Sequence, residues 1–228
     1  VALHREHLVE RLAERDNEGM ELFLEKKEVP VALLKKAVRA ATLSLQAVPV
    51  LLGSSFRNKG VQNLLDAVVD YLPSPADQAD VAGFDPKSGR KLARKLSDAE
   101  PLSALVFKIM TDPYVGQLVY FRVYSGVVKL GATVLNGRRG QKLRLAKLLK
   151  MHANKREEVD AVHAGDIAAT VGLKDVATGD TLCDERHPIV LDAIQFPEPV
   201  VQATIEPRLT AEHQKLDEVL AKLVSEDP

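Results

Sequence analysis

The feature that most constrains the fold is a change in the spacing of apolar residues at Leu105. From there they fall on alternate positions, first in Leu105, Phe107 and Ile109 and again in Val119, Phe121 and Val123. A period of two is typical of short strands, and turn residues separate them here. The separating glycines are Gly116, Gly126, Gly131, Gly137, Gly140, Gly165, Gly172 and Gly179. We therefore predict a compact antiparallel β-barrel over residues 101–188. Between Leu143 and Met151 the alternation fails, and either a bulge or a short helical turn explains it.

The chain before Leu105 has a different pattern. Residues 3–27 have helical spacing, with a break expected at Asn17 and Gly19, and a second helix is predicted to begin with Pro30 in its first turn. The apolar run 48–52 is typical of a strand buried on both faces of a parallel sheet, and a helix over 61–72 follows it. One such strand cannot make a sheet, so most of this α/β domain is expected to lie outside the chain.

Two further segments complete the organisation. Residues 76–100 are polar and broken by Gly83, Pro86 and Gly89, which predicts a mobile linker. Residues 200–205 are predicted as a strand, and Thr210 as the cap of a helix that buries one apolar side. The fold class is therefore multidomain: an α/β remnant, an all-β barrel, and the opening strand and helix of a third domain over 195–228.

Composition excludes several classes of protein. With 46% hydrophobic and 28% charged residues in 228, the chain is neither disordered nor rich enough in apolar runs for a membrane span. Its single cysteine, Cys183, excludes an intrachain disulfide and any multi-cysteine metal site, and is predicted to be a half-buried strand residue. Because the first residue is Val1 and no leader pattern follows, we expect an excised fragment.

The net charge of −1 hides an uneven distribution. Residues 113–156 contain no Asp or Glu and ten basic residues, which leaves a balance of −11 for the rest of the chain. Such a stretch attracts phosphates, although an ordinary solvated face is the alternative. Tyr114, Tyr120 and Tyr124 could add stacking or simply pack the barrel. The predicted RNA-binding residues are Arg122, Arg138, Arg139, Lys142, Arg144, Lys147 and Lys150.

No catalytic or metal constellation is evident in the sequence. His4 and His7 lack a third ligand, and Asp175 and Asp180 are read as turn residues beside glycines, not as an acid/base pair. No catalytic residue and no metal ligand is predicted.

A series of motifs resembles bacterial-type elongation factor G just after its GTPase core. The motifs run in the order Gly53–Gln62, Leu64–Pro75, Arg122–Gly126, Ala164–Ile167, Gly172–Lys174, Thr178–Leu182, Phe196–Val200 and Ile205–Pro207. The resemblance implies that residues 1–45 end the helical insert of a GTPase domain and 46–75 are its last strand and helix. Residues 101–188 are then a translation-factor barrel, and 195–228 open a ferredoxin-like domain.

The resemblance also implies nucleotide chemistry in the full-length protein, with GTP and magnesium as its ligands. Ser54, Ser55 and Phe56 lie where the family reads the guanine carbonyl through loop N–H groups, with Ser55 in place of the usual Ala. Asn58-Lys59 is not the guanine signature, because Val61 stands at its Asp position. No phosphate-binding loop is present, so this chain is expected to bind no nucleotide alone and to be inactive as a GTPase.

The expected role is that of a ribosomal translocase fragment whose barrel docks on small-subunit rRNA. We expect a cytoplasmic monomer, with an organellar form also open, that binds neither DNA nor membrane. Two alternatives remain: another translational GTPase acting in ribosome recycling, ribosome protection or back-translocation, or a non-enzymatic module that adds a peptide to an edge strand.

Overall fold

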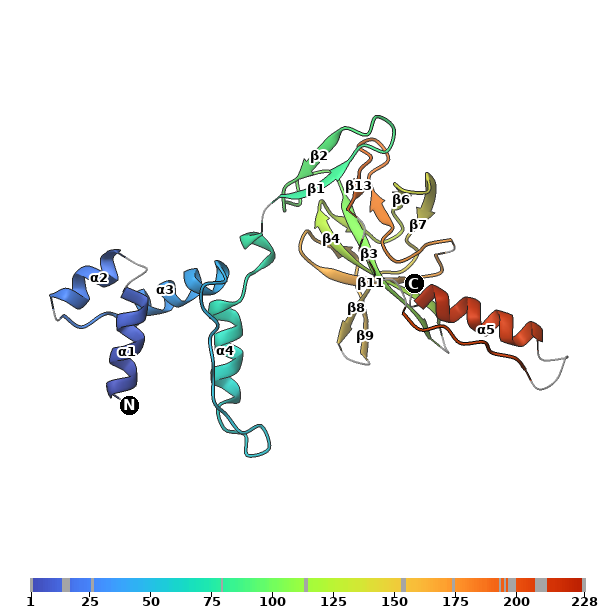
Figure 1. Cartoon of the computed structure of the whole chain (residues 1–228). Coiled ribbons are helices and arrows are strands. Elements are labelled where there is room, and N and C mark those ends of the chain that lie inside the picture. Colours follow the sequence, from blue (N-terminus) through green and yellow to red (C-terminus); the bar gives the residue numbers. More distant parts are fainter. Residues whose placement is uncertain are drawn as a thin grey trace. The chain divides into compact units, whose positions relative to one another are not determined.

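The computed structural model describes residues 2–13, 17–25, 27–78, 80–112, 115–152, 155–173, 175–192, 194, 196, 200–207 and 213–226. They form two compact units, 1–78 and 79–228, which are treated separately (Figure 1). No helix among the described residues is both long and apolar enough to cross a bilayer. The predicted cap Thr210 and the predicted aromatic Tyr114 lie outside the described residues.

The first unit is helical. Its elements are α1 (Ala2–Ala13), α2 (Asn17–Leu24), α3 (Val31–Leu43), α4 (Val61–Tyr71) and the short 3₁₀ turn η1 (Pro75–Asp77). A break at Asn17 and Gly19 was predicted, but both residues lie within α2, and residues 14–16 between α1 and α2 lie outside the described residues. Pro30 is the residue that precedes α3, not part of its first turn, and its carbonyl accepts the N–H of Leu34 at 3.1 Å. A small core around Val9, Leu12 and Leu34 joins α1, α2 and α3.

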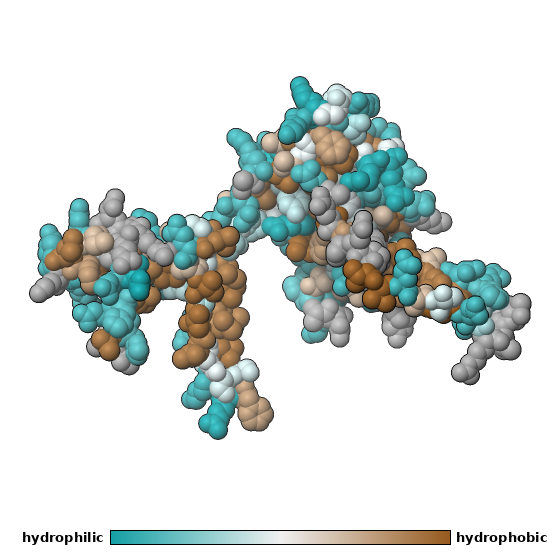
Figure 2. All heavy atoms as spheres, viewed as in Figure 1, coloured by the Kyte–Doolittle hydropathy of each residue, from teal (hydrophilic) through white to brown (hydrophobic). Residues whose placement is uncertain are grey.

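The predicted strand at 48–52 is not formed. These residues are neither helix nor strand, and Val48, Val50 and Leu52 are 84%, 84% and 94% exposed. A strand needs a neighbour for its backbone hydrogen bonds, and none of the described residues of this unit supplies one. Helix α4 forms as predicted but buries only Ala67, so its apolar side chains remain on the surface (Figure 2).

The second unit is built on antiparallel strands, which confirms the predicted barrel. Within the described residues, an eight-stranded sheet has the order β7-β6-β12-β3-β4-β11-β8-β9. Its strands are β3 (Ser103–Asp112), β4 (Gly116–Ser125), β6 (Thr133–Asn136), β7 (Gln141–Arg144), β8 (Leu149–His152), β9 (Lys155–Glu158), β11 (Ile167–Val171) and β12 (Thr181–Cys183). Two further strands, β5 (Val128–Lys129) and β10 (Ala161–Val162), pair with each other.

The barrel core confirms the predicted alternation in β4, where Val119, Phe121 and Val123 are completely buried. The predicted alternation of Leu105, Phe107 and Ile109 in β3 is wrong, because the pairing register shifts between Val106 and Lys108. Val106 and Ile109, three residues apart, are both completely buried, and Phe107 is only partly buried. At Gly126 the backbone turns with φ of 73°, and a Cβ there would lie 2.7 Å from the backbone of Leu102. Glycine is therefore required at the end of β4 for both its conformation and its small size.

The segment where alternation failed is neither a bulge nor a helical turn. Residues 145–148 are irregular chain between β7 and β8, and both Leu145 and Leu148 are fully buried. The backbone of Leu145 pairs with Ala132 and Gly131, at 2.9 and 2.8 Å. Two leucines three residues apart both face the core because this connection leaves the pleated geometry of a strand.

The prediction of a mobile loop at 76–100 is wrong. Residues there form a hairpin of β1 (Val81–Phe84) and β2 (Lys91–Arg94), and β1 also pairs with β13 (Val190–Leu191). Ile189 and Leu191 anchor the hairpin by packing with Val81 and Leu92. The sequence concealed these strands because each has only four residues, and the segment around them is polar and broken by Gly83, Pro86 and Gly89.

The C-terminal segment is partly as expected. Helix α5 (His213–Glu226) forms and lies against β3, where Glu226 Oε1 accepts the Thr111 N–H at 2.7 Å. The predicted strand at 200–205 is unpaired, with Val200 97% exposed, and none of the described α5 residues is fully buried. As at 48–52, nothing among the described residues completes a sheet.

Candidate nucleic-acid interface

The β6–β7 hairpin carries four of the seven predicted RNA-binding residues, namely Arg138, Arg139, Lys142 and Arg144. Hydrogen bonds from two side chains hold its turn: Asn136, which is fully buried, and Asp180, which is 2% exposed. Asn136 Oδ1 accepts the N–H groups of Arg138 and Arg139, both at 3.2 Å. Asn136 Nδ2 in turn donates to Asp180 Oδ2 at 2.8 Å. The two arginines therefore project from a turn that buried hydrogen bonds fix in place.

Asp180 has a structural role in this arrangement. Its Oδ2 also accepts from Arg139 Nε at 3.1 Å and from the Ala177 N–H at 3.0 Å. A buried carboxylate needs such partners, and here they come from two segments of the barrel, the β6–β7 hairpin and the chain just before β12. All these contacts are within the fold. Asp175, with φ of 56°, lies in a turn as predicted.

The structure places the seven predicted residues in three environments. Arg138 and Arg144 are exposed, and no described carboxylate lies at ion-pair distance from either. Arg139 pairs with buried Asp180, and Lys142 pairs with Glu185 at 2.6 Å between side chains that are 61% and 54% exposed. A pair as exposed as the second contributes about 0–1 kcal/mol and exchanges readily for another anion.

Lys147 and Lys150 belong to a different part of the barrel. Lys147 pairs with Glu158 at 2.9 Å, and Lys150 with Asp166 at 3.0 Å. Nearby, Arg156 pairs with Asp112. The acidic partners Glu158, Asp166 and Asp112 all lie outside residues 113–156. The fold therefore brings carboxylates close to a stretch that contains none in its own sequence.

Arg122 lies on β4 and is partly buried. Its guanidinium carbon is 5.3 Å from the centre of the Tyr124 ring, which is the geometry of a cation–π contact. Its Nε is buried without a described hydrogen-bond partner. Arg122 is therefore engaged within the barrel and presents less of its charge to solvent than Arg138. Tyr120 packs near Phe107, with ring centres 6.3 Å apart.

The predicted nucleotide-binding residues form a closed loop. The backbones of Ser54 and Lys59 exchange two hydrogen bonds, at 2.9 and 3.0 Å, and Gly60 follows with φ of 75°. The N–H groups of Ser55 and Phe56 donate to no acceptor among the described residues, and Phe56 is fully exposed. The loop borders a cavity of about 250 Å³ lined by Ser54, Ser55 and Lys59. Among the described residues, this loop thus has two backbone N–H donors without an acceptor.

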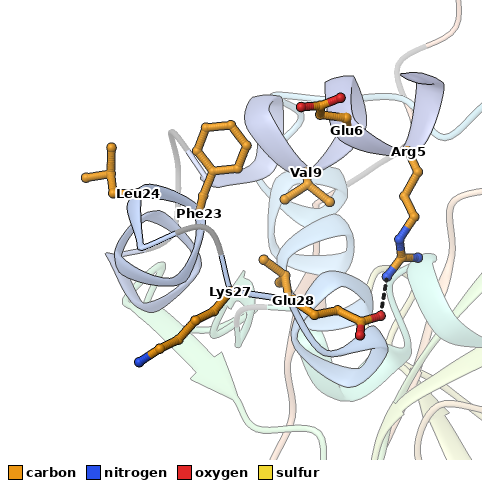
Figure 3. Close-up of a pocket in the computed structure, with 8 residues that line it drawn as sticks. Arg5, Glu6, Val9, Phe23, Leu24, Lys27 and Glu28 are labelled. Atoms are coloured by element: carbon orange, nitrogen blue, oxygen red, sulfur yellow. Dashed lines mark ion pairs between the residues drawn. The ribbon is translucent and has the colours of Figure 1, made fainter. Parts of the chain in front are cut away.

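A larger pocket, which was not predicted, lies between α1, α2 and residues 27–29. It has a volume of about 710 Å³, and Val9, Phe23 and Leu24 supply its apolar walls (Figure 3). Arg5 and Glu28 pair at its edge at 3.8 Å, but both are well exposed. Among its described lining residues no buried polar group points into it, so its chemistry favours no particular ligand.

The remaining reactive groups have ordinary surroundings. Cys183 is fully buried, and burial raises the pKa of its thiol, which makes it a poor nucleophile. Cys183 lies on a strand, β12, as predicted, but it is fully buried and not half-buried. Among the described residues, no three His, Cys, Asp or Glu side chains gather as a metal site requires.

The sequence prediction missed one group of basic residues, on the β1–β2 hairpin. Residues 86–97 contain no Asp or Glu, and this signal was available in the sequence. The group was missed because residues 76–100 were interpreted as a linker. In a linker these cations are not expected to lie together on one folded surface. The group is Lys87, Arg90, Lys91, Arg94 and Lys95.

Two comparisons with known proteins bear on this arrangement. Residues 116–183 match the family model for Elongation factor Tu domain 2. A crystal structure of a protein from Thermus thermophilus matches 98% of this chain with a TM-score of 0.74 and 28% sequence identity. The match covers 31% of that protein's chain, so this chain spans about a third of its length. Residues 116–183 are thus similar to the second domain of elongation factor Tu, and 98% of the chain is similar to part of the Thermus protein.

Proposed function

We propose that this chain is a section of an elongation-factor-G-like translocase, which uses GTP to move tRNA and mRNA through the ribosome. In this proposal the barrel docks on small-subunit rRNA through the β6–β7 hairpin. The observation that carries it is the pair Arg138 and Arg144, exposed and without a described acidic partner on the β6–β7 hairpin, whose turn Asn136 fixes. The match to the elongation factor Tu barrel supports a ribosomal partner.

The β6–β7 hairpin suits phosphates for an electrostatic reason. Arg138 and Arg144 need break no described ion pair to meet a phosphate, and Lys142 gives up only an exposed one. Each phosphate neutralised releases counterions, which gives an affinity that falls steeply with salt. Lys147 and Lys150 must first leave Glu158 and Asp166, so we expect a smaller contribution from them.

The test is binding of the chain to isolated small ribosomal subunits over a series of salt concentrations. The double variant Arg138→Gln/Arg144→Gln should bind about tenfold or more weakly, and its log–log salt slope should fall by about 2, one for each lost phosphate contact. Lys147→Gln/Lys150→Gln should lose less. Lys215→Gln/Lys222→Gln on α5 removes the same charge elsewhere and is the matched control.

Two results would count against this function. Equal losses from all three double variants would indicate a general charge effect. An unchanged affinity for Arg138→Gln/Arg144→Gln would favour the protein-interaction module. A recycling, protection or back-translocation factor would give the same binding result as a translocase, so translocation needs its own assay on a longer form that carries the phosphate-binding loop.

We also propose that Ser54, Ser55 and Phe56 read the guanine base when the rest of the GTPase domain is present. This chain supplies no phosphate-binding loop and no residues to place magnesium, so phosphate release from GTP should stay at the level of buffer. In a longer form, Ser55→Pro removes one open N–H donor and should weaken GDP binding, whereas Ser55→Ala should not. Equal GDP affinities for the two variants would show that this loop does not contact the guanine base.

A further inference from the structure

The β1–β2 hairpin is a rigid projection of the second unit. Its turn closes with the Asp85 N–H donating to the Arg90 carbonyl and the Gly89 N–H donating to the Asp85 carbonyl, both at 2.9 Å. The Asp85 carboxylate accepts the N–H groups of Lys87 and Ser88, each at 2.8 Å. These backbone hydrogen bonds lower the pKa of Asp85. Its carboxylate is thus occupied in holding the turn.

One face of the hairpin is packed against the barrel unit. Val81 and Leu92 contact the cluster around Ile189, and Gly83 lies so close to β13 that a Cβ there would be 2.5 Å from the Val190 carbonyl oxygen. Arg94 also turns to this side, since its Nη2 donates to the His187 carbonyl at 3.3 Å. The hairpin is therefore positioned by its inner face, which leaves the outer face for contacts with other molecules.

The outer face combines small residues, one aromatic ring and several cations. Ala82 is the register partner of Ala93, and Phe84 is the register partner of Lys91. All four are exposed, with Phe84 39% exposed. Side chains directly opposite each other on antiparallel strands are about 5 Å apart at their Cβ atoms. The ring of Phe84 and the ammonium group of Lys91 are thus neighbours on this face. The other two side chains, those of Ala82 and Ala93, are small and leave the ring accessible.

The cations of this face keep their charge available. Lys87, Arg90, Lys91 and Lys95 are exposed, and none of them forms an ion pair with a described carboxylate. This differs from β8, β9 and the connection before β8, where Lys150, Arg156 and Lys147 are paired with carboxylates. The charge on the hairpin is complementary to a polyanion.

We propose that the outer face of the β1–β2 hairpin binds single-stranded RNA, separately from the β6–β7 surface. A base stacks on Phe84 while phosphates on either side meet Arg90 and Lys91, which is how stacking and charge combine in single-strand binding. An acidic protein segment would use the cations but not the ring. Addition of a peptide strand to the β2 edge is opposed by the charges along it.

The test uses the whole chain and a fluorescently labelled short oligouridylate, with binding followed by anisotropy across a salt series. Arg90→Gln/Lys91→Gln should weaken binding about tenfold and lower the log–log salt slope by about 1.4, for two single-strand phosphates. Phe84→Ala should weaken binding about fivefold or more with the slope unchanged, because stacking releases no counterions. Lys215→Gln/Lys222→Gln is again the charge-matched control, and far-ultraviolet circular dichroism checks that each variant folds.

Three outcomes would overturn the proposal. The first is an affinity of Arg90→Gln/Lys91→Gln equal to that of the α5 control. The second is an affinity of Phe84→Ala equal to that of the unchanged chain. The third is polyglutamate competing as well as unlabelled oligouridylate, which would assign the face to an acidic protein. Because Arg138→Gln/Arg144→Gln alters the other surface, its separate effect on small-subunit binding keeps the two proposals distinguishable.

Discussion

The helical unit and the barrel unit contain similar apolar segments, but these segments are buried in the barrel unit and exposed in the helical unit. In the barrel, Val119, Phe121 and Val123 are completely buried. In the helical unit, Val48, Val50 and Val69 are 78–84% exposed although their sequence pattern is equally apolar. The barrel strands pair within the chain and enclose their own side chains, whereas the 48–52 segment and α4 have no described sheet to cover them. Apolar patterning thus specifies an element's inner face, but burial depends on the partner.

The difference should be largest in core substitutions. Phe121→Ala should lower the free energy of unfolding of the barrel by about 3–5 kcal/mol, because it removes a large fully buried side chain and leaves a cavity. Val69→Ala on α4 should change stability by less than about 0.5 kcal/mol. Urea unfolding followed by circular dichroism and by amide exchange of the barrel strands measures both. A comparable loss for Val69→Ala would mean that α4 is covered in solution.

The buried hydrogen bonds of the β6–β7 turn should give the next largest effect. Asn136→Ala removes the donor to Asp180 and the acceptor of two N–H groups, so we expect a loss of about 1–3 kcal/mol. Amide exchange of Arg138 and Arg139 should accelerate in the same variant. Gln141→Ala, at an exposed position of the same hairpin, is the control. Unchanged exchange at both arginines would show that Asn136 does not hold the turn.

The helical unit should depend more on polar surface contacts. Arg39 donates to the carbonyl of Asp70 at 3.0 Å and pairs with Asp77 at 2.5 Å, which links α3 to the chain after α4. Because both side chains are about a third exposed, Arg39→Ala should cost about 0.5–1 kcal/mol. The exposed Lys36→Ala is the control. Local amide exchange in α4 is the measurement, and equal exchange in the two variants would contradict this role.

The smallest expected effect is a pH dependence at Asp98. The Ala164 N–H and the His163 ring contact this carboxylate at 3.0 and 2.7 Å, and they lower its pKa from the ordinary 3.8. A lowered folded-state pKa favours the carboxylate, so its contribution is complete above pH 3.8 and is lost as the pH falls through the folded value. Asp98→Asn should reduce the slope of stability against pH below this value. Parallel thermal unfolding curves across that range would rule out the contribution.

Much of the barrel could be predicted because strand alternation and glycine turns are local properties. The helices at 31–43 and 61–71 were equally clear from their 3.6-residue spacing. The β1–β2 hairpin was not, because four-residue strands carry little periodic signal and its stability comes from Ile189 and Leu191, about a hundred residues later. The strands at 48–52 and 200–205 were predicted from patterns that require neighbours to be realised.

For the candidate interface, the sequence by itself determined the number and order of the cations and the lack of acids among residues 113–156. Only the tertiary structure decided which of them stay unpaired. The fold brings Glu158 beside Lys147 and Asp166 beside Lys150, while the β6–β7 turn leaves Arg138 and Arg144 without a described carboxylate. The physical reason is that Coulomb energy depends on distance in space, and the path of the folded chain, not sequence separation, sets that distance.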